Sequence, residues 1–422
     1  MTERREKGAG YHHEAKIILS ESDTVRPSGA IEHKERYIDN TEGVIVSEIS
    51  GTWNAVTKNA EGEAQIHTLA KHSVKTRPLP VELQLENVLP KAHPIHITPS
   101  RAKPKNRKNK VAFDIPDLQM GWRMNERGLM TPTHSPEAID VMLQVLYDVQ
   151  PDLVVLGGDE QDWPEFSRFT PDSNQFSSYT LQDALTSGER LFAQLRANAP
   201  NARIHNLASN HNTTRLDNYL AKAATVLLGV RRAGDKYPLI SYPNLLQLEK
   251  YDIEYVGGYP AEVMNINDRL ITFHGDKATQ NSTAHQYLAD LDSGMGLMFH
   301  HTHRREEAYK RRKHSSAANM GRQSVAFSFG CLANIDGAVP SFNNAVKTNG
   351  QVARFQENWV NGFGIVEYDE GDAPFRQQFV HIDDTDGFRA WFNGKEYTPQ
   401  GLAAAGYSYQ FGTNSPAEAD IL

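Results

Sequence analysis

The sequence predicts an α/β domain built around a sheet and preceded by a small β-rich module. From Val111 onward, short apolar runs that suit buried strands alternate with longer segments that suit helices, and later strands follow one another without long helices. Residues 31–95 contain short alternating segments instead, with a hairpin signal in KNAEGEAQ, residues 58–65. These two patterns predict a larger mixed domain after a smaller all-β one.

The first predicted helix has a clear beginning. In SPEAIDVMLQVLYDVQ, residues 135–150, Ser135 is a suitable N-cap and Pro136 a suitable first helical residue. The run DLVVLGGD, residues 152–159, follows it and is typical of a strand buried on both faces. A helix followed by a buried strand is the repeat expected of an α/β domain.

Two more helices and several strands continue this pattern. A helix is expected over residues 177–200, although Gly188 weakens it, and a strand over residues 202–211. The next helix is expected over residues 213–229, where Gly229 would stop it. The later runs DRLITFHGD, GMGLMFHHTH, QSVAFSFGC and GFGIVEYDE are predicted strands.

Changes in composition suggest five segments. They are a flexible arm at 1–30, a β-rich module at 31–95, a basic linker at 96–110, the main domain at 111–370 and a C-terminal extension at 371–422. The linker contains RAKPKNRKNK, in which six of ten residues are basic. Like charges favour a solvated segment, and the alternative is an arm that contacts phosphates.

Composition excludes several classes of protein. The 422-residue chain has a net charge of −8, so it is not a basic nucleic-acid coat as a whole. Its single cysteine, Cys331, excludes an intrachain disulfide framework. The sequence has no apolar run of membrane-spanning length and no apolar stretch behind its charged N-terminus. We therefore expect a cytoplasmic protein with no membrane partner.

Polar residues follow the predicted strands at the points where the strands end. In α/β sheets, the loops at these ends are where ligands bind. Carboxylates, an amide and imidazoles together suit divalent manganese, iron or zinc. The residues concerned are Asp117, Asp159, Asn210, His274, His301 and His303.

Five motifs in this part of the chain resemble those of the calcineurin-like metallophosphoesterase superfamily. They are DLQ at 117–119, GDEQD at 158–162, SNHN at 209–212, FHG at 273–275 and HHTH at 300–303. The superfamily pattern is D-x-H, GD-x-x-D, GNH-[DE], a lone His after a strand, and GHxH, in this order. The resemblance implies a β-sandwich core flanked by helices and a phosphoesterase that uses two divalent ions to activate a water molecule.

The resemblance also assigns roles to individual residues. Asp159 would bridge both ions, Asp117 and His303 would hold the first ion together with Gln119, and Asn210, His274 and His301 would hold the second. His211 would protonate the leaving oxygen or stabilise the transition state. The expected ions are manganese, with iron, zinc or nickel as alternatives.

Four positions depart from the superfamily pattern. Gln119 replaces the first-ion histidine, and a neutral amide is a poorer ligand, so the first site is expected to be weaker, more dependent on added manganese, or completed by water. Ser209 replaces a glycine, which is a mild change. Asn212 replaces an acid, so Asp162 is expected to orient His211 instead. His300 occupies a glycine position and could be a packing residue.

Asp114 and Asp117 could each begin the first motif. Asp114 is followed by Ile-Pro, and proline cannot ligate a metal. Asp117 is followed by Leu-Gln and then Met-Gly, as the superfamily's first motif requires. Asp117 is therefore the expected ligand and Asp114 a strand residue, with a supporting contact behind the metal ligands as the alternative for Asp114.

The substrate is expected to be a nucleic acid or nucleotide phosphodiester. Arginines that follow the motifs could hold a phosphate, and six basic residues lie between positions 304 and 313. The segments SFGCLANIDGAVPS, residues 328–341, and ENWVNGFGIVEYD, residues 357–369, have a looser similarity to phage-encoded and bacterial nuclease-like members, and a phage protein would act in the host cytoplasm. The alternatives are a phosphomonoesterase or protein phosphatase with the same ions, and a binding protein that has lost turnover. The arginines concerned are Arg123, Arg215, Arg304 and Arg305.

Overall fold

The chain forms two compact units, Met1–Pro90 and Lys91–Leu422, in a computed structural model. The structure describes the backbone of five strands in the first unit. In the second unit it describes residues 108–124, 130–167, 178–279, 282–311, 321–335, 339 and 358–400. Most of the predicted basic linker, residues 96–107, and the tail at 401–422 lie outside the described residues.

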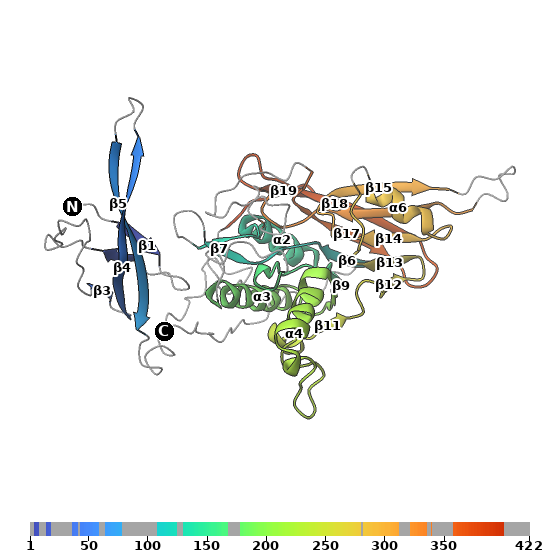
Figure 1. Ribbon diagram of the computed structural model, residues 1–422. Coiled ribbons are helices and arrows are strands. Elements are labelled where there is room, and N and C mark those ends of the chain that lie inside the picture. Colours follow the sequence, from blue (N-terminus) through green and yellow to red (C-terminus); the bar gives the residue numbers. More distant parts are fainter. Residues whose placement is uncertain are drawn as a thin grey trace. The chain divides into compact units, whose positions relative to one another are not determined.

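The first unit consists of antiparallel strands (Figure 1). Strand β1 pairs with β2 inside the segment expected to be an arm, and β3, β4 and β5 form a three-stranded sheet. The bounds are Arg4–Lys7 for β1, Glu14–Ile17 for β2, Arg36–Asn40 for β3, Gly43–Lys58 for β4 and Ala64–Arg77 for β5. The segment boundaries themselves stay a prediction.

An eight-stranded sheet forms the centre of the second unit, in the order β11-β10-β9-β6-β17-β18-β19-β20. Its parallel half comprises β6 (Lys110–Ile115), β9 (Leu153–Leu156), β10 (Arg203–Leu207) and β11 (Ile253–Val256). Its antiparallel half comprises β17 (Gly362–Tyr368), β18 (Phe375–Asp383), β19 (Arg389–Phe392) and β20 (Lys395–Tyr397). Since β18 pairs with β17, this sheet continues past residue 370.

A second sheet has five strands in the order β12-β13-β14-β16-β15. Strands β13, β14 and β16 are parallel to one another, and the two edge strands run antiparallel to their neighbours. The bounds are Met264–Asn267 for β12, Leu270–Phe273 for β13, Gly296–Phe299 for β14, Arg305–Lys310 for β15 and Ser324–Phe329 for β16. A short hairpin pairs β7 (Trp122–Met124) with β8 (Met130–Pro132).

The first helix confirms the predicted capping. Helix α2 spans Pro136–Val149, and the Ser135 side chain accepts a hydrogen bond from the Ala138 amide. Helix α3 spans Ser178–Asn198 and continues through Gly188, where an added Cβ would lie 2.2 Å from the Gln161 side chain. Gly188 therefore allows α3 to approach the loop that follows β9.

The predicted end of the next helix is wrong. Helix α4 spans only Leu216–Ala223, and a 3₁₀ turn follows at Thr225–Leu227. Val226, Leu227 and Leu228 are exposed, so no packing holds them in a longer helix. The other helical segments are a 3₁₀ turn at Pro164–Phe166, a π-helical turn at Asn210–Arg215, α5 (Tyr242–Leu245), a 3₁₀ turn at Leu248–Tyr251 and α6 (Thr283–Asp290).

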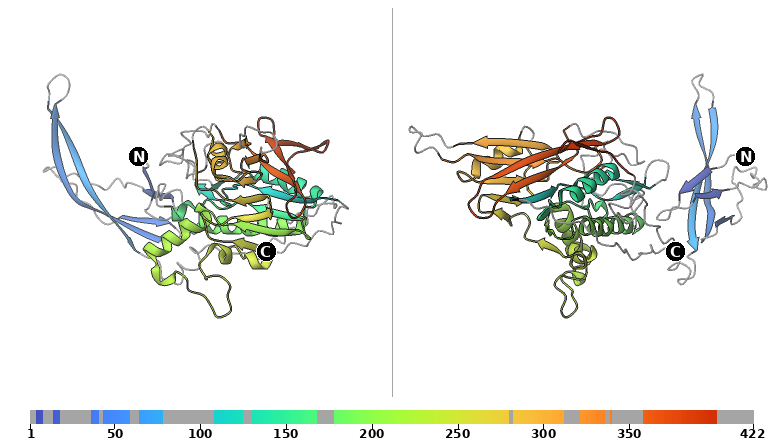
Figure 2. Two further views of the ribbon diagram at one scale, coloured as in Figure 1. Left: turned by 90° about the vertical axis from the view of Figure 1, so that its right-hand side faces the viewer. Right: turned by 180° about the vertical axis from the view of Figure 1, so that it is seen from behind.

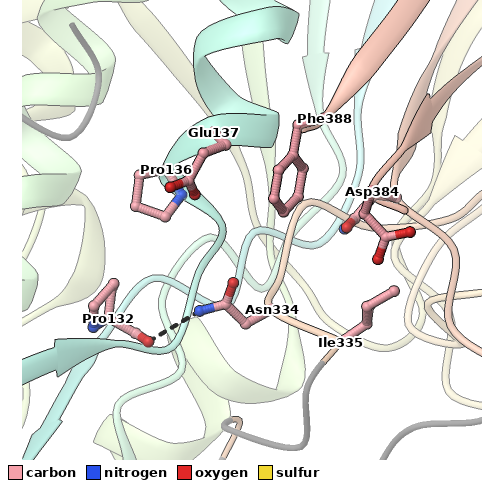
Figure 3. Close-up of a pocket in the computed structure, with 8 residues that line it drawn as sticks. Pro132, Pro136, Glu137, Asn334, Ile335, Asp384 and Phe388 are labelled. Atoms are coloured by element: carbon pink, nitrogen blue, oxygen red, sulfur yellow. Dashed lines mark hydrogen bonds between the residues drawn. The ribbon is translucent and has the colours of Figure 1, made fainter. Parts of the chain in front are cut away.

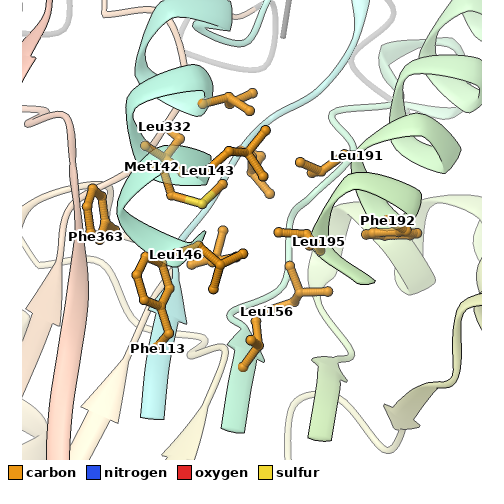
Figure 4. Packing of buried hydrophobic residues seen from close by; sticks show 14 of the residues in the cluster. Phe113, Met142, Leu143, Leu146, Leu156, Leu191, Phe192, Leu195, Leu332 and Phe363 are labelled. Carbon is orange, nitrogen blue, oxygen red and sulfur yellow. The ribbon is translucent and has the colours of Figure 1, made fainter. Parts of the chain in front are cut away.

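Three apolar clusters show that the second unit has four layers (Figure 2). The first cluster packs α2 and α3 against the eight-stranded sheet, and Figure 4 shows their side chains meeting those of β6, β9 and β17. The second cluster joins the inner faces of the two sheets, and the third packs α6 on the outer face of the five-stranded sheet. A two-sheet α/β core flanked by helices confirms the predicted fold class. No helix among the described residues is long and apolar enough to span a bilayer.

Candidate metal centre

Polar side chains from both sheets meet at the carboxyl ends of the parallel strands. The eight-stranded sheet supplies carboxylates and an amide, and the five-stranded sheet supplies imidazoles. Rigid strands on two sides can hold such groups at fixed separations, as a polar site in an α/β protein requires. The residues are Asp117 after β6, Asp159 after β9, Asn210 after β10, His274 after β13, and His301 and His303 after β14.

These side chains form two groups that share one carboxylate. Asp159 lies with Asp117 and His303 in the first group, and with His274 and His301 in the second. In each group the candidate ligand atoms all lie within 4.8 Å of one another. The His303 Nε2 atom is 3.1 Å from Asp117 Oδ1, and the His274 Nε2 atom is 3.2 Å from Asp159 Oδ2. The grouping matches the division between two ions that the sequence predicts, and ligation itself stays a prediction.

Asn210 belongs beside the second group. Its Oδ1 atom lies 3.0 Å from His274 Nε2, so the amide oxygen faces the same space as the imidazole. The other ring nitrogen of His274, Nδ1, lies 2.8 Å from the Gly157 carbonyl oxygen. Because a carbonyl can only accept, Nδ1 carries a proton and Nε2 is left as the ligand atom.

The backbone that carries these residues adopts an uncommon conformation. Gln119, Asp159, His301 and His303 all have φ between 51° and 73°, in the left-handed region that ordinary residues rarely adopt. The strand-end loops hold one another in place, since the backbone amide of Gln119 donates to the backbone carbonyl of Asp159 at 2.9 Å. Backbone strain of this kind concentrates at functional sites, where the surrounding structure maintains it.

Gln119 lies in the first group and is fully buried. Its Nε2 atom is 3.3 Å from Asp159 Oδ2 and 3.4 Å from His303 Nε2. Its Oε1 atom has no hydrogen-bond partner among the described residues. A buried amide oxygen without a donor is costly unless a cation or another donor satisfies it, so the residues present fit a metal ion here.

The ionisable side chains of the site shift one another's pKa values. Burial alone would raise the pKa of Asp159, but the positive charges of His211 and His274 outweigh it and hold that pKa well below its usual range. Burial opposes protonation of His274, but the Asp159 carboxylate raises its pKa to about 9. Burial, with the nearby charge of His274, lowers the pKa of His301 to about 4. The two buried carboxylates thus require compensating positive charge, and a divalent cation would supply it.

His211 contacts the two side chains best suited to orient it. Its Nδ1 atom lies 2.9 Å from Asp162 Oδ1, and its Nε2 atom lies 3.0 Å from Nη2 of Arg215. Arg215 also lies 3.1 Å from Asp162 Oδ1, so one carboxylate oxygen faces both side chains. The His211 amide donates to Asp159 Oδ1 at 3.0 Å, which places the imidazole at the edge of the second group. The structure therefore puts Asp162 where the sequence predicts an orienting acid.

Ser209 and Asn212, two of the departures from the superfamily pattern, hold the loops of the site. The Ser209 hydroxyl accepts from the amides of Asp159 and Asn212, at 2.9 and 3.3 Å. The Asn212 side-chain oxygen accepts from the Gln161 amide at 3.1 Å. Both residues thus tie the loop after β10 to the loop after β9.

A buried carboxylate that sequence reasoning missed completes this connection. Glu160 is fully buried and accepts hydrogen bonds from the Gly158 amide, the Asn212 side chain and the Tyr242 hydroxyl. Burial raises the pKa of Glu160 despite these bonds. An acid next to Asp159, inside a motif, was the available signal, but Tyr242 is distant in the sequence and gave no indication of the contact.

The four predicted phosphate-binding arginines have different surroundings. Arg215 contacts His211, as described above. Arg304 donates to the Thr279 carbonyl at 2.9 Å and pairs with Glu306 at 3.1 Å. Arg305 lies over the Phe379 ring, and Arg123 is buried. Of the four, Arg215 makes a described contact to a predicted site residue, His211.

A pocket of about 360 Å³ lies at the N-terminal end of α2 (Figure 3). The Asn334 side chain donates to the Pro132 carbonyl at its edge, at 3.1 Å. None of the predicted site residues is among those that line it, so it is separate from the metal groups. The lining residues are Pro132, Pro136, Glu137, Asn334, Ile335, Asn361, Asp384 and Phe388.

Comparisons with known proteins give weak likenesses. No family model matches the sequence. The chain is 26% identical over 245 residues to the Gene 54 protein of Mycobacterium phage D29, covering 56% of this chain and 85% of that protein. It also has a likeness to purple acid phosphatase PPD1 from yellow lupin seeds, at 9% identity and a TM-score of 0.29, covering 82% of this chain and 58% of that one. At these values neither likeness assigns an activity.

Proposed function

We propose that this protein is a two-metal-dependent phosphoesterase that hydrolyses phosphodiesters of nucleic acid or nucleotides. The observation that carries the proposal is the pair of Asp/His groups that share buried Asp159 where the two sheets meet. Carboxylate, amide and imidazole ligands suit manganese first, with iron, zinc or nickel as alternatives. When bound, two such ions activate a water molecule and neutralise the charge on the phosphoryl oxygens.

The protein's own residues then have separable tasks. Asp159 and Asp117 supply negative charge, and His274, His301 and His303 would ligate through imidazole nitrogens once His274 has lost the proton that Asp159 stabilises. His211 is the proposed proton donor to the leaving oxygen, with Asp162 beside its Nδ1 to orient the ring. Its Nε2 accepts from Arg215, which can only donate, so Arg215 has to turn to the substrate phosphate before Nε2 carries the proton. Arg215, 3.0 Å from that nitrogen, is the proposed contact for a phosphate oxygen.

Two basic segments support a polyanionic substrate. One lies between residues 101 and 110 before β6, and the other begins at Arg304 and continues beyond the end of β15 at Lys310. Lysine and arginine side chains along a nucleic-acid backbone contribute affinity that does not depend on base sequence. A phosphodiester in a nucleic acid is therefore the proposed substrate, in preference to a monoester.

A direct assay separates these activities. Purified protein with Mn²⁺ would receive bis-p-nitrophenyl phosphate, p-nitrophenyl phosphate, and single- and double-stranded DNA. We expect cleavage of the diester and of DNA, and we expect EDTA to abolish both. Hydrolysis of the monoester alone would indicate a phosphatase instead of a phosphodiesterase, and metal binding without any hydrolysis would indicate a binding protein.

A further inference from the structure

His300 occupies a central position beneath the proposed metal site. Its imidazole is fully buried between the two sheets, directly before His301 in the chain. Its Nε2 atom lies 2.9 Å from Asp114 Oδ1, which is on β6 of the eight-stranded sheet. Its Nδ1 atom lies 3.1 Å from the Phe273 carbonyl oxygen, at the end of β13. One ring thus joins a strand of one sheet to a strand of the other.

The hydrogen-bonding partners fix how this ring carries its protons. The Phe273 carbonyl can only accept, so Nδ1 of His300 carries a hydrogen and donates it. On the other side, Nε2 and the Asp114 carboxylate share a proton in a hydrogen bond with no solvent access. The second carboxylate oxygen of Asp114, Oδ2, has no hydrogen-bond partner among the described residues. The bond from Oδ1 to His300 is therefore the main interaction that compensates for burial of this carboxylate.

The neighbouring backbone leaves room for the ring. An added Cβ on Gly157 would lie 2.3 Å from the His300 ring, so only glycine fits at this end of β9. The His300 amide also donates to the His274 carbonyl at 2.8 Å. His300 therefore contacts β6, β9 and the end of β13, while it belongs to the loop after β14.

Each of these four strands carries a proposed metal ligand just beyond the contact. Asp114 precedes Asp117 by three residues, Gly157 precedes Asp159 by two, and Phe273 and His300 directly precede His274 and His301. The His301 amide donates to Asp117 Oδ2 at 3.1 Å, a second link between the sheets at the same level. The distance between the ligands of one sheet and the ligands of the other thus depends on how the strands meet at His300.

We propose that His300, through its cross-sheet hydrogen bond to Asp114, is a positioning residue that sets the distance between the carboxylate ligands and the imidazole ligands. It does not ligate an ion itself, since both ring nitrogens are engaged. The inference rests on the proposed function, because it concerns ligands of the same metal centre. Removing a residue that supports metal ligands from behind typically lowers metal affinity about 10–100-fold.

Two conservative substitutions separate the two contacts of His300. In His300→Gln, the side-chain amide nitrogen can reach the place of Nε2, so the link to Asp114 is retained. In His300→Asn, the shorter amide takes the place of Nδ1, so the link to Phe273 is retained and the link to the other sheet is lost. His300→Ala and Asp114→Ala remove the cross-sheet bond altogether.

The full-length protein and these variants would be titrated with Mn²⁺ alone by calorimetry, and their melting temperatures measured without metal. We expect at least about tenfold weaker binding for His300→Asn, His300→Ala and Asp114→Ala, and a smaller loss for His300→Gln. Leu153→Ala is the matched control, since it removes buried side-chain volume from the same inter-sheet core at the opposite end of β9. It should lower the melting temperature and leave Mn²⁺ affinity unchanged.

The possible results are distinguishable. Unchanged affinity in His300→Asn and Asp114→Ala would overturn the positioning role and leave the proposed function standing. An equal loss in Leu153→Ala would also overturn it, because general loss of stability would then explain the effect. A wild-type protein that binds no Mn²⁺ would overturn both the proposed function and this inference.

Discussion

The two sheets make different contributions to the proposed metal centre. The eight-stranded sheet supplies the carboxylates, the amide and His211, whereas the five-stranded sheet supplies only histidines. The acidic side is held by a dense set of hydrogen bonds within one sheet, through Ser209, Glu160 and Asn212. The histidine side is joined to the acidic side by His300 to Asp114, by the His301 backbone amide to Asp117 and by His274 to the Gly157 carbonyl.

The difference between the two sheets shows how buried negative charge in the site is balanced. Two buried carboxylates on one side repel each other unless positive charge lies near. His211 on the same sheet and His274 on the other sheet provide it for Asp159, and His303 and His274 provide it for Asp117. Binding of divalent ions would replace that arrangement, because histidine ligates as the neutral imidazole. The carboxylates of the eight-stranded sheet should therefore determine whether ions bind, and the histidines of the five-stranded sheet should determine how tightly each ion is held.

The largest effect is expected from the acidic side. Asp159→Asn removes the charge shared by both groups while keeping the shape of the side chain. Activity should fall by about 10³-fold or more, because charge stabilisation is usually the largest catalytic contribution. Elemental analysis of the purified variant should also show less bound metal than wild type. Retention of two ions per chain would contradict the shared role of Asp159.

Next in size is the loss of the proposed proton donor. His211→Ala should lower kcat for the diester by about 10²–10⁴-fold, the usual contribution of general acid catalysis. Metal content should not change, because His211 contributes to neither Asp/His group. Asp162→Asn is the companion variant and should have a smaller effect, since it weakens only the orientation of the ring. Undiminished cleavage by His211→Ala would exclude this role.

A gain in metal affinity is expected from replacing Gln119, the residue at which the first group departs from the superfamily pattern. Gln119→His places an imidazole next to His303 and Asp159, and imidazole is a better ligand than a neutral amide for these ions. Mn²⁺ affinity of the weaker site should rise by about tenfold, or about 1.4 kcal/mol. Calorimetric titration would measure it, and a fall in affinity would show that the Gln119 amide is itself the better fit.

The smallest effect is expected from the loop contacts of the acidic side. Ser209→Ala removes the hydroxyl that accepts from the Asp159 and Asn212 amides. The free energy of unfolding should fall by about 1–2 kcal/mol, the usual cost of losing a capping side chain. Chemical denaturation would measure this change. A loss of metal binding as large as that of Asp159→Asn would show that Ser209 does more than hold the loops.

Local sequence signals predicted a large part of the fold. Ser135 and Pro136 marked the beginning of α2, because capping depends only on neighbouring residues. The strand ends with their polar residues were also visible, since each motif is short and contiguous. The length of α4 was mispredicted because helix extent depends on packing, and Val226 and Leu227 are exposed. Strands β18–β20, beyond residue 370, likewise depend on pairing with β17, which is not a local property.

The candidate site was predicted unevenly for the same reason. The residues of the two Asp/His groups lie in motifs, so their meeting at the strand ends could be anticipated from the order of the strands. The role of Glu160 depends on Tyr242, and that of His300 depends on Asp114, which is 186 residues away. Such long-range pairs leave no mark in a single sequence. The structure thus adds the supporting contacts behind ligands that the sequence already indicated.

The most direct test of this account is a crystal of the wild-type protein grown with Mn²⁺ and measured for anomalous scattering. We expect two peaks about 3.5–4 Å apart, one beside Asp117 and His303 and one beside His274 and His301, with Asp159 between them. Absence of any peak at these residues, with manganese present at saturating concentration, would contradict a metal centre where the two sheets meet.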